Sequence, residues 1–190
     1  MNWILASGSP RRRELLEMLG VPNLTIRPAK GPERATPGAG PEQTVRELAL
    51  HKAQEVAQTC APEDIVIAAD TIVYLGGVIL GKPKDTADAA RMLAALSGRE
   101  HTVYTGVAVL RGGEMRQAAE HTAVRFRTLT PAEIARYIAT GEPMDKAGAY
   151  GIQGRGALFV AHLDGDYFNV MGLPLCRLGQ LLNELGVELL

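Results

Sequence analysis

The sequence predicts an α/β fold built on a mixed, twisted β-sheet with flanking helices. Helical and strand patterns both recur along its 190 residues. The glycine pairs Gly76-Gly77 and Gly112-Gly113 separate apolar runs and indicate β-hairpins, which interrupt any simple alternation of strand and helix. The hydrophobic fraction of 46 % suits a chain that buries one sizeable core. We therefore expect a single domain over residues 1–190.

Local patterns define the elements of the N-terminal half. Pro10 stands where a first helical turn accepts proline, and leucines at helical spacing continue until Gly20 ends the helix. The next stretch is rich in Pro and Gly and has no periodicity, which predicts a loop. β-Branched residues then indicate a central strand that runs into Asp70 and Thr71. The expected elements are a strand over 3–6, a helix over 10–20, a loop over 27–41, a helix over 42–60, a strand over 65–69 and a hairpin over 71–80.

Capping and turn signals define the C-terminal half. Thr86 is the expected N-cap of a helix that Gly98 ends. Thr130 is followed by Pro131 and Glu133, the pattern of a capped helix start. The expected elements are a helix over 86–96, a hairpin of strands 103–110 and 117–128, a helix over 130–140, an irregular glycine-rich segment over 141–156, a pair of strands over 157–163 and 167–171, and a final helix over 173–190.

Charge and composition exclude several classes of partner. The formal net charge is −1, whereas a protein that binds nucleic acid through a broad basic face carries a positive excess, so we expect no nucleic-acid partner. Apolar runs fall short of the roughly 20 residues that a membrane helix needs, and no signal-peptide pattern opens the chain. The two cysteines, Cys60 and Cys176, are too few for a disulfide scaffold. We expect a cytoplasmic protein.

The stretch "ILASGSPRRRELLEML", residues 4–19, predicts an anion site. Cations at a helix N-terminus oppose the partial positive charge already present there, so something anionic is expected between them. A strand, a tight Ser-Gly-Ser turn and a helix start present Ser9 and backbone N–H groups, and Arg11 and Arg12 add forked donors that suit phosphate oxygens. The simpler alternative is a solvated basic helix start, and the residues leave both interpretations open.

Asp70 ends a predicted buried strand, where ligands bind in open α/β sheets. Its carboxylate can hold a metal or activate a water, although a turn or cap aspartate is an equal alternative. Lys52, Lys82 and Glu33 are weaker candidates, since single lysines and loop acids are usually solvated. The four histidines and two cysteines show no metal-ligand spacing, and no Gly-x-Ser-x-Gly elbow indicates a serine hydrolase.

The stretch "DKAGAYGIQGRGALF", residues 145–159, is the third candidate. Its glycines would let the backbone approach a ligand closely, and the Gln153 amide offers the donor and acceptor that match a nucleobase edge. A flexible surface loop is the alternative interpretation. Because an amide can flip, Gln153 alone does not separate the 4-oxo edge of uracil or thymine from the 4-amino edge of cytosine.

Taken together, these stretches resemble the Maf family of nucleotide pyrophosphatases, once described as inhibitors of septum formation. The segments "LASGSPRRRELLEMLG", "AADTIVYLGGVILGKPKD", "SGREHTVYTGVAV", "EPMDKAGAYGIQGRGALFV" and "GDYFNVMGLPL" follow the order of the family and span almost the whole chain. The form "DKAGAYGIQG" is similar to the branch that acts on dTTP and UTP. One departure is Pro32, where many relatives carry a second acidic residue before Glu33.

The resemblance implies two lobes around a deep cleft, as in pyrophosphatases that remove inosine triphosphate. It also implies a divalent cation, Mg²⁺ or Mn²⁺, a cytoplasmic setting and a homodimer. The catalytic aspartate of the family falls on Asp70, which with Glu33 would contact the metal. The remaining positions implied by the resemblance are Arg12, Thr71 and Gln153 for specificity, and Ser9, Arg11, Glu33, Lys52 and Lys82 as charged or polar cleft residues.

The expected activity is hydrolysis of dTTP and UTP between the α and β phosphates, with a link to the arrest of cell division. Asp70, Glu33, Lys52 and Lys82 would be catalytic, because phosphoryl-type transfer depends mainly on positioning and charge stabilisation. Two alternatives stay open: a non-catalytic nucleotide sensor that regulates septum formation, and a regulator that binds nucleic acid. The sensor would need the arginine turn and the glycine-rich loop but not the two acids.

Overall fold

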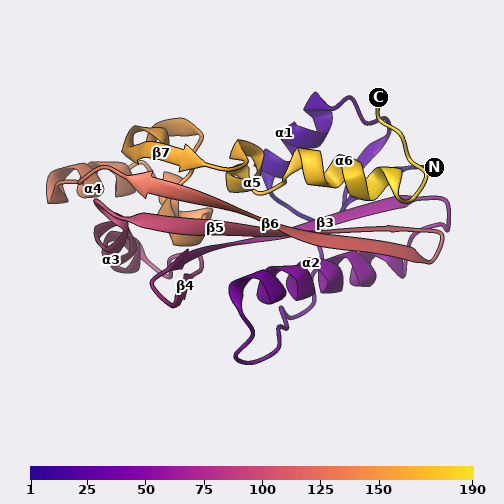
Figure 1. Cartoon of the computed structure of the whole chain (residues 1–190), viewed down its shortest axis with the longest axis horizontal. Coiled ribbons are helices and arrows are strands. Elements are labelled where there is room, and N and C mark those ends of the chain that lie inside the picture. The colour runs from indigo at the N-terminus through magenta and orange to yellow at the C-terminus, as the bar shows by residue number, and fades with distance from the viewer. The chain divides into compact units, whose positions relative to one another are not determined.

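The computed structural model describes residues 1–190 and shows a seven-stranded mixed sheet (Figure 1). The strand order is β2-β1-β3-β5-β6-β7, and β4 pairs with β3. β1 is parallel to β2 and β3, whereas β4 is antiparallel to β3 and β7 is antiparallel to β6. The strands are β1 (Trp3–Leu5), β2 (Leu24–Ile26), β3 (Ile65–Leu75), β4 (Val78–Leu80), β5 (Glu100–Arg111), β6 (Glu114–Phe126) and β7 (Val160–Asp164).

Helices flank this sheet, so the predicted fold class is confirmed. The glycine-rich region after α4 forms three short 3-10 segments, whose bounds are Glu142–Asp145, Ala147–Ala149 and Gly154–Phe159. No helix in the chain has both the length and the apolar character needed to cross a membrane. The helices are α1 (Pro10–Met18), α2 (Pro41–Ala57), α3 (Thr86–Leu96), α4 (Pro131–Ile138), α5 (Tyr167–Met171) and α6 (Leu175–Asn183).

The chain divides into two compact units. The first consists of Met1–Asp70, Thr105–Glu120 and Gly172–Leu190. The second consists of Thr71–Tyr104 and His121–Met171. The long strands β3, β5 and β6 contribute residues to both units, and each unit has its own apolar core. That the two units act as one domain stays a prediction.

In the first unit, α2 covers one side of the strands, and α1 and α6 lie on the other side (Figure 1). The core under α2 consists of small and β-branched side chains, among them Ala49, Ala53 and Val66. β5 approaches α2 so closely at Gly106 that an added Cβ would lie 2.1 Å from the Val45 carbonyl oxygen. Only glycine fits there, and this contact fixes how near the helix lies to the sheet.

In the second unit, aromatic rings form much of the core. Phe126 lies edge-on to Tyr150 at 4.7 Å between ring centroids, and Tyr137 lies edge-on to Phe159 at 4.8 Å. Such edge-to-face pairs are favourable beyond the area they bury. The fully enclosed His101 ring joins this cluster 5.0 Å from Phe126.

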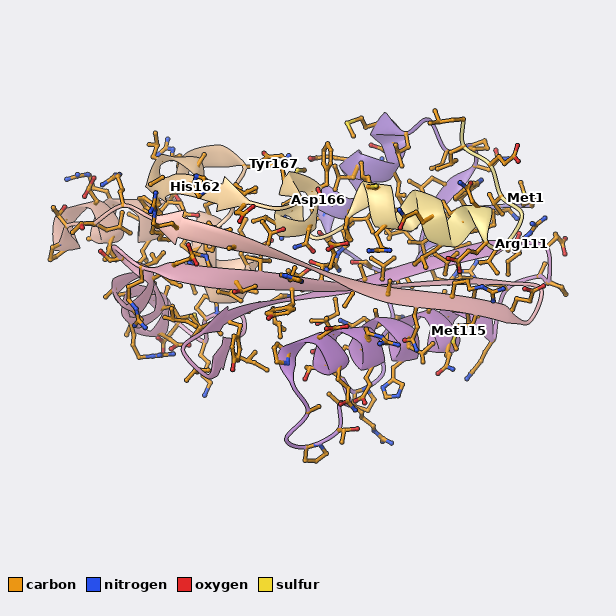
Figure 2. All side chains as sticks on the ribbon, viewed as in Figure 1. Met1, Arg111, Met115, His162, Asp166 and Tyr167 are labelled. Carbon is orange, nitrogen blue, oxygen red and sulfur yellow. The ribbon has the colours of Figure 1, made fainter.

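The expectation of a strand over 167–171 is wrong, because this segment is the helix α5. The Asp166 side chain accepts a hydrogen bond from the backbone N–H of Phe168 at 2.7 Å, which favours a helical turn. Figure 2 labels Asp166 and Tyr167, where α5 begins. The fully buried Asn169 then donates to the Val103 carbonyl at 3.0 Å, and β7 pairs with β6 instead. A hydrophobic run alone did not distinguish a buried helical turn from a strand.

Two smaller features of the structure differ from the sequence-based description. The strand β2 had not been expected, since its Leu-Thr-Ile triplet is largely exposed and too short to show a period. The N-cap of α3 is Asp85, not Thr86, and its carboxylate accepts from the Asp88 N–H at 2.8 Å. The capping box of α4 is confirmed, with Thr130 and Glu133 each accepting from the other's backbone N–H.

Because His101 is buried, the free energy of unfolding should decrease at acid pH. Burial lowers the pKa of this imidazole to about 4, and its Nε2 lies 2.8 Å from the Tyr150 hydroxyl. As the pH falls below the ordinary value of 6.5, the unfolded chain binds a proton that the folded chain does not accept. Stability from this group is therefore complete above the ordinary pKa and is lost as the pH falls towards the folded value. The full loss is about 3 kcal/mol.

We expect His101→Phe to remove the pH-dependent part of the unfolding free energy that comes from His101. Urea unfolding of the wild type and the variant between pH 7 and pH 4 measures this part. It is the difference between the two pH dependences, because the other groups titrate equally in both proteins. The wild type should lose about 3 kcal/mol more of its unfolding free energy than the variant over this range. Parallel curves would contradict a neutral His101 in the core.

Candidate functional site

The turn between β1 and α1 holds Arg12 in a fixed orientation. Arg12 Nε donates to the Gly172 carbonyl at 2.7 Å, and Nη1 donates to the Ser7 hydroxyl at 3.0 Å. The same Ser7 oxygen accepts from the backbone N–H of Ser9 at 3.2 Å. Ser9 is the N-cap of α1, but its hydroxyl makes no capping hydrogen bond, so it is not committed to the helix. In the turn that the sequence predicts to bind phosphate, the Arg12 guanidinium is thus held in place by Ser7 and the Gly172 carbonyl.

Two acids offset the burial of the Arg12 charge. Desolvation lowers its pKa to about 10, and the positive charge of Arg11 acts in the same direction. Asp70 and then Glu33 act in the opposite direction, because their negative charges favour the guanidinium. At neutral pH Arg12 is therefore cationic, and the first unit brings it into electrostatic reach of both acids and of Arg11.

Lys52 links the two acids directly. Its ammonium contacts Asp70 Oδ1 and Glu33 Oε1, the latter at 2.7 Å. The three side chains come from β3, α2 and the loop before α2, so three separate elements converge on one charge cluster. Exposure increases across it, from 12 % for the Asp70 side chain to 64 % for that of Glu33. The enclosed end therefore has the lower effective dielectric, where charges interact more strongly. We call Asp70, Lys52 and Glu33 the acid–lysine cluster.

Other acids on α2 hold the loop that carries Glu33. The Glu55 carboxylate accepts from the backbone N–H groups of Lys30 and Gly31 at 2.7 and 3.0 Å. On the other side of Glu33, the Glu47 carboxylate accepts from the Thr36 N–H at 2.7 Å. A Cβ on Gly31 would lie 2.6 Å from Glu55 Oε2, so glycine is required for this approach. Both anchors lie on the helix that carries Lys52.

The remaining predicted residues belong to the second unit. Thr71 is half-buried on β3, Lys82 is exposed between β4 and α3, and Gln153 is half-buried just before the last 3-10 segment. That these three side chains act together with the acid–lysine cluster stays a prediction. Within the first unit, electrostatic proximity and ion pairs bring together Arg11, Arg12, Asp70, Lys52 and Glu33, and Ser9 donates its backbone N–H to the Ser7 oxygen that also accepts from Arg12. That these residues form a nucleotide site stays a prediction.

The glycines around Gln153 serve the protein's own packing. An added Cβ would lie 2.8 Å from Val73 Cγ2 at Gly148, and 2.8 Å from Glu142 Oε2 at Gly154. At Gly156 it would lie 2.3 Å from the Gly151 carbonyl oxygen. The sequence pattern suggested close approach of a ligand, whereas these contacts account for the same glycines by internal close approach.

Several contacts that position the site carried no sequence signal. Ser7 and the Gly172 carbonyl fix Arg12, yet they lie 165 positions apart in the chain by their numbers. Glu55 and Glu47 looked like ordinary charged positions of an amphipathic helix. Their role depends on the path of the loop, which the sequence does not show.

The sequence is similar to a family of known proteins over almost its whole length. A sequence model described as "Maf-like protein" matches residues 2–185. A protein of Moorella thermoacetica named dTTP/UTP pyrophosphatase is 55 % identical over 187 residues, covering 97 % of this chain and 95 % of its own. A protein of Symbiobacterium thermophilum with the same name is 52 % identical over 183 residues, covering 96 % and 93 %.

Among solved structures, similarity extends to a protein of Mycobacterium abscessus described as a nucleoside-triphosphatase or dITP/XTP pyrophosphatase. It is 17 % identical, covers 97 % of both chains and gives a TM-score of 0.45. A score this low supports no argument, and the fold rests on the strand order and helices described above.

We expect the effects of substituting Lys52 and Asp70 on the unfolding free energy to be strongly coupled. Lys52→Met should lower the unfolding free energy by up to about 3–5 kcal/mol, because an enclosed Asp70 carboxylate would lose its cation. Lys84→Met changes an exposed lysine and serves as the control. Adding Asp70→Asn to Lys52→Met removes the unpaired charge and should restore much of the loss, which a double-mutant cycle in urea measures. Additive effects of the two substitutions would contradict the coupling.

Proposed function

Because the chain belongs to the Maf family, we propose that it is a nucleoside triphosphate pyrophosphatase acting on dTTP and UTP. The products are the nucleoside monophosphate and pyrophosphate. The observation that carries the proposal is the acid–lysine cluster together with Arg12, which brings acids and cations close to one another within the first unit. The relatives named dTTP/UTP pyrophosphatase support the same activity.

In this mechanism the acid–lysine cluster prepares the attack on the α-phosphorus. Asp70 orients and deprotonates the attacking water, and its enclosure in the protein strengthens that interaction. Lys52 keeps the Asp70 carboxylate in place and offers its ammonium to the phosphate oxygens. Arg12 and Arg11 neutralise charge on the phosphate chain, for which a forked guanidinium is suited. The protein thus contributes positioning and charge rather than covalent chemistry.

The donor set also fits a divalent cation. No group of three or more His, Cys, Asp or Glu side chains is placed to hold a metal without help. Mg²⁺, however, is usually bound by one or two carboxylates together with substrate phosphates. Asp70 and Glu33 supply such a pair, and they already surround a positive charge on Lys52. When bound, Mg²⁺ or Mn²⁺ would withdraw charge from the phosphate oxygens.

The second unit supplies base recognition in this proposal. Gln153 reads the 4-oxo and N3–H edge of thymine or uracil through one donor and one acceptor. Thr71 contributes to specificity and Lys82 to neutralisation of the departing pyrophosphate, as the family resemblance implies. Ser9 offers its hydroxyl to a phosphate oxygen, and the support is that this hydroxyl does not cap α1.

The setting of the protein is inferred from the same resemblance. We infer a cytoplasmic enzyme that assembles as a homodimer around a small-molecule substrate, with no nucleic acid. The family resemblance also implies a link to cell-division arrest. The net charge of −1 supports the absence of a nucleic-acid partner.

Pyrophosphate release tests the activity. We expect purified protein with Mg²⁺ to release pyrophosphate from dTTP and UTP faster than from the other nucleoside triphosphates. Asp70→Asn should lower turnover by at least about 10²–10³-fold, because it removes a group that acts on the reacting atoms. Nucleotide binding, measured by calorimetry, should persist in the variant. Binding without turnover in the wild type would instead identify a nucleotide sensor.

Substitution of Gln153 tests base reading. Gln153→Glu replaces a donor and an acceptor by two acceptors, which face the 4-oxo acceptor of the base. We expect kcat/KM for dTTP and UTP to fall about 10- to 100-fold, as for loss of a hydrogen bond that leaves a polar group unpaired. Gln58→Glu makes the same change at an exposed position of the first unit and is the control. Unchanged rates in Gln153→Glu would remove Gln153 from recognition.

A further inference from the structure

A carboxylate clamps the backbone immediately after Gln153. Glu142 Oε2 accepts from the Arg155 N–H at 3.1 Å, and Glu142 Oε1 accepts from the Gly156 N–H at 3.1 Å. Burial alone would raise the pKa of Glu142, but these two N–H groups and the Tyr137 hydroxyl outweigh it and lower the pKa. The side chain is therefore an anion at neutral pH, and hydrogen bonds to an ionised acceptor are the stronger kind.

A buried hydroxyl extends the clamp to the residues before Gln153. Tyr137 on α4 is 4 % exposed, and its hydroxyl donates to Glu142 Oε1 at 2.9 Å. The Tyr137 hydroxyl oxygen in turn accepts from the Gly151 N–H at 3.2 Å. Burial raises the pKa of Tyr137, so the hydroxyl keeps the proton that it donates. Gln153 thus lies between backbone positions that one connected network holds on both sides.

Glycine is required at two positions where Glu142 and Tyr137 approach the backbone of this segment. Gly154 has φ +74°, and a Cβ there would lie 2.8 Å from Glu142 Oε2. A Cβ on Gly156 would lie 2.8 Å from the Tyr137 hydroxyl oxygen. Side chains at these positions would push the loop away from its anchors. The two glycines therefore allow Glu142 and Tyr137 to approach the backbone of this segment closely.

We propose that Tyr137 and Glu142 are positioning residues that set selectivity for the pyrimidine base by fixing the backbone on both sides of Gln153. This inference rests on the proposed role of Gln153 in reading the base. An amide separates bases only if its donor and acceptor are held to within about 0.5 Å and 10–20°. Neither positioning residue needs to touch the nucleotide, because the backbone N–H groups of Gly151, Arg155 and Gly156 transmit the constraint.

Selectivity distinguishes this role from a merely structural one. Tyr137→Phe removes only a hydroxyl, and Glu142→Gln keeps the shape of the side chain while placing an N–H₂ against a backbone donor. Both variants should lower kcat/KM for dTTP about 10-fold, mainly through KM. The rate with ATP should change little, so the dTTP-to-ATP ratio of kcat/KM falls. Glu100→Gln changes an exposed acid of the same unit and should leave the ratio unchanged.

The same measurements in a Gln153→Ala background complete the experiment. There the base is no longer read, so Tyr137→Phe and Glu142→Gln should produce no further fall in the ratio. Melting temperatures identify which variants fold, and the milder Tyr137→Phe carries the test if Glu142→Gln does not.

The outcomes distinguish failure of the positioning role of Tyr137 and Glu142 from failure of base reading by Gln153. If Gln153→Ala lowers the ratio but neither positioning variant does, the inference is overturned and the reading by Gln153 stands. An equal fall of the ratio with and without Gln153 would also overturn the inference, since the network would then act elsewhere. An unchanged ratio in Gln153→Ala itself would refute base reading, and the inference would fall with it.

Discussion

The Lys52 ammonium, held between Asp70 and Glu33, is the interaction on which the rest of the site depends. At this ammonium, a strand, a helix and an irregular loop each contribute one charged side chain to the same pair of ion pairs. An enclosed carboxylate is costly without a partner, and a loop carboxylate has no fixed place without an anchor. One lysine meets both needs, and its position is set by how α2 lies on the sheet. Gly106 of β5 permits the close approach of α2 to the sheet, which an added Cβ would prevent.

The same physical device positions both irregular segments of the chain. Glu55 and Glu47 accept backbone N–H groups on either side of Glu33, and Glu142 accepts those that follow Gln153. Loops lack the regular hydrogen bonds of helices and strands, so their N–H groups need partners from elsewhere. A carboxylate can accept two at once and holds them more strongly than a neutral acceptor does. These carboxylates therefore give both irregular segments a defined backbone conformation. One segment carries Glu33 and the other carries Gln153.

Local chemistry explains how much of the fold could be predicted. The Gly-Gly hairpins and the Thr130–Glu133 capping box depend on neighbouring residues, so the sequence indicated them correctly. The helix α5 depends on Asn169, whose buried amide bonds to Val103 from a distant strand. Such tertiary hydrogen bonds leave no periodic signal. For the site, residue types and order identified the candidates, but the contacts that position them, such as Arg12 with the Gly172 carbonyl, join segments that are remote in sequence.

We propose that the acid–lysine cluster directs water to the α-phosphorus of the substrate. Hydrolysis of dTTP in water enriched in ¹⁸O, followed by phosphorus NMR of the products, identifies the phosphorus that the water attacks. We expect the label to enter the phosphate of dTMP and the released pyrophosphate to stay unlabelled. Label in pyrophosphate, or release of orthophosphate with dTDP, would contradict it, because the water would then have attacked a different phosphorus.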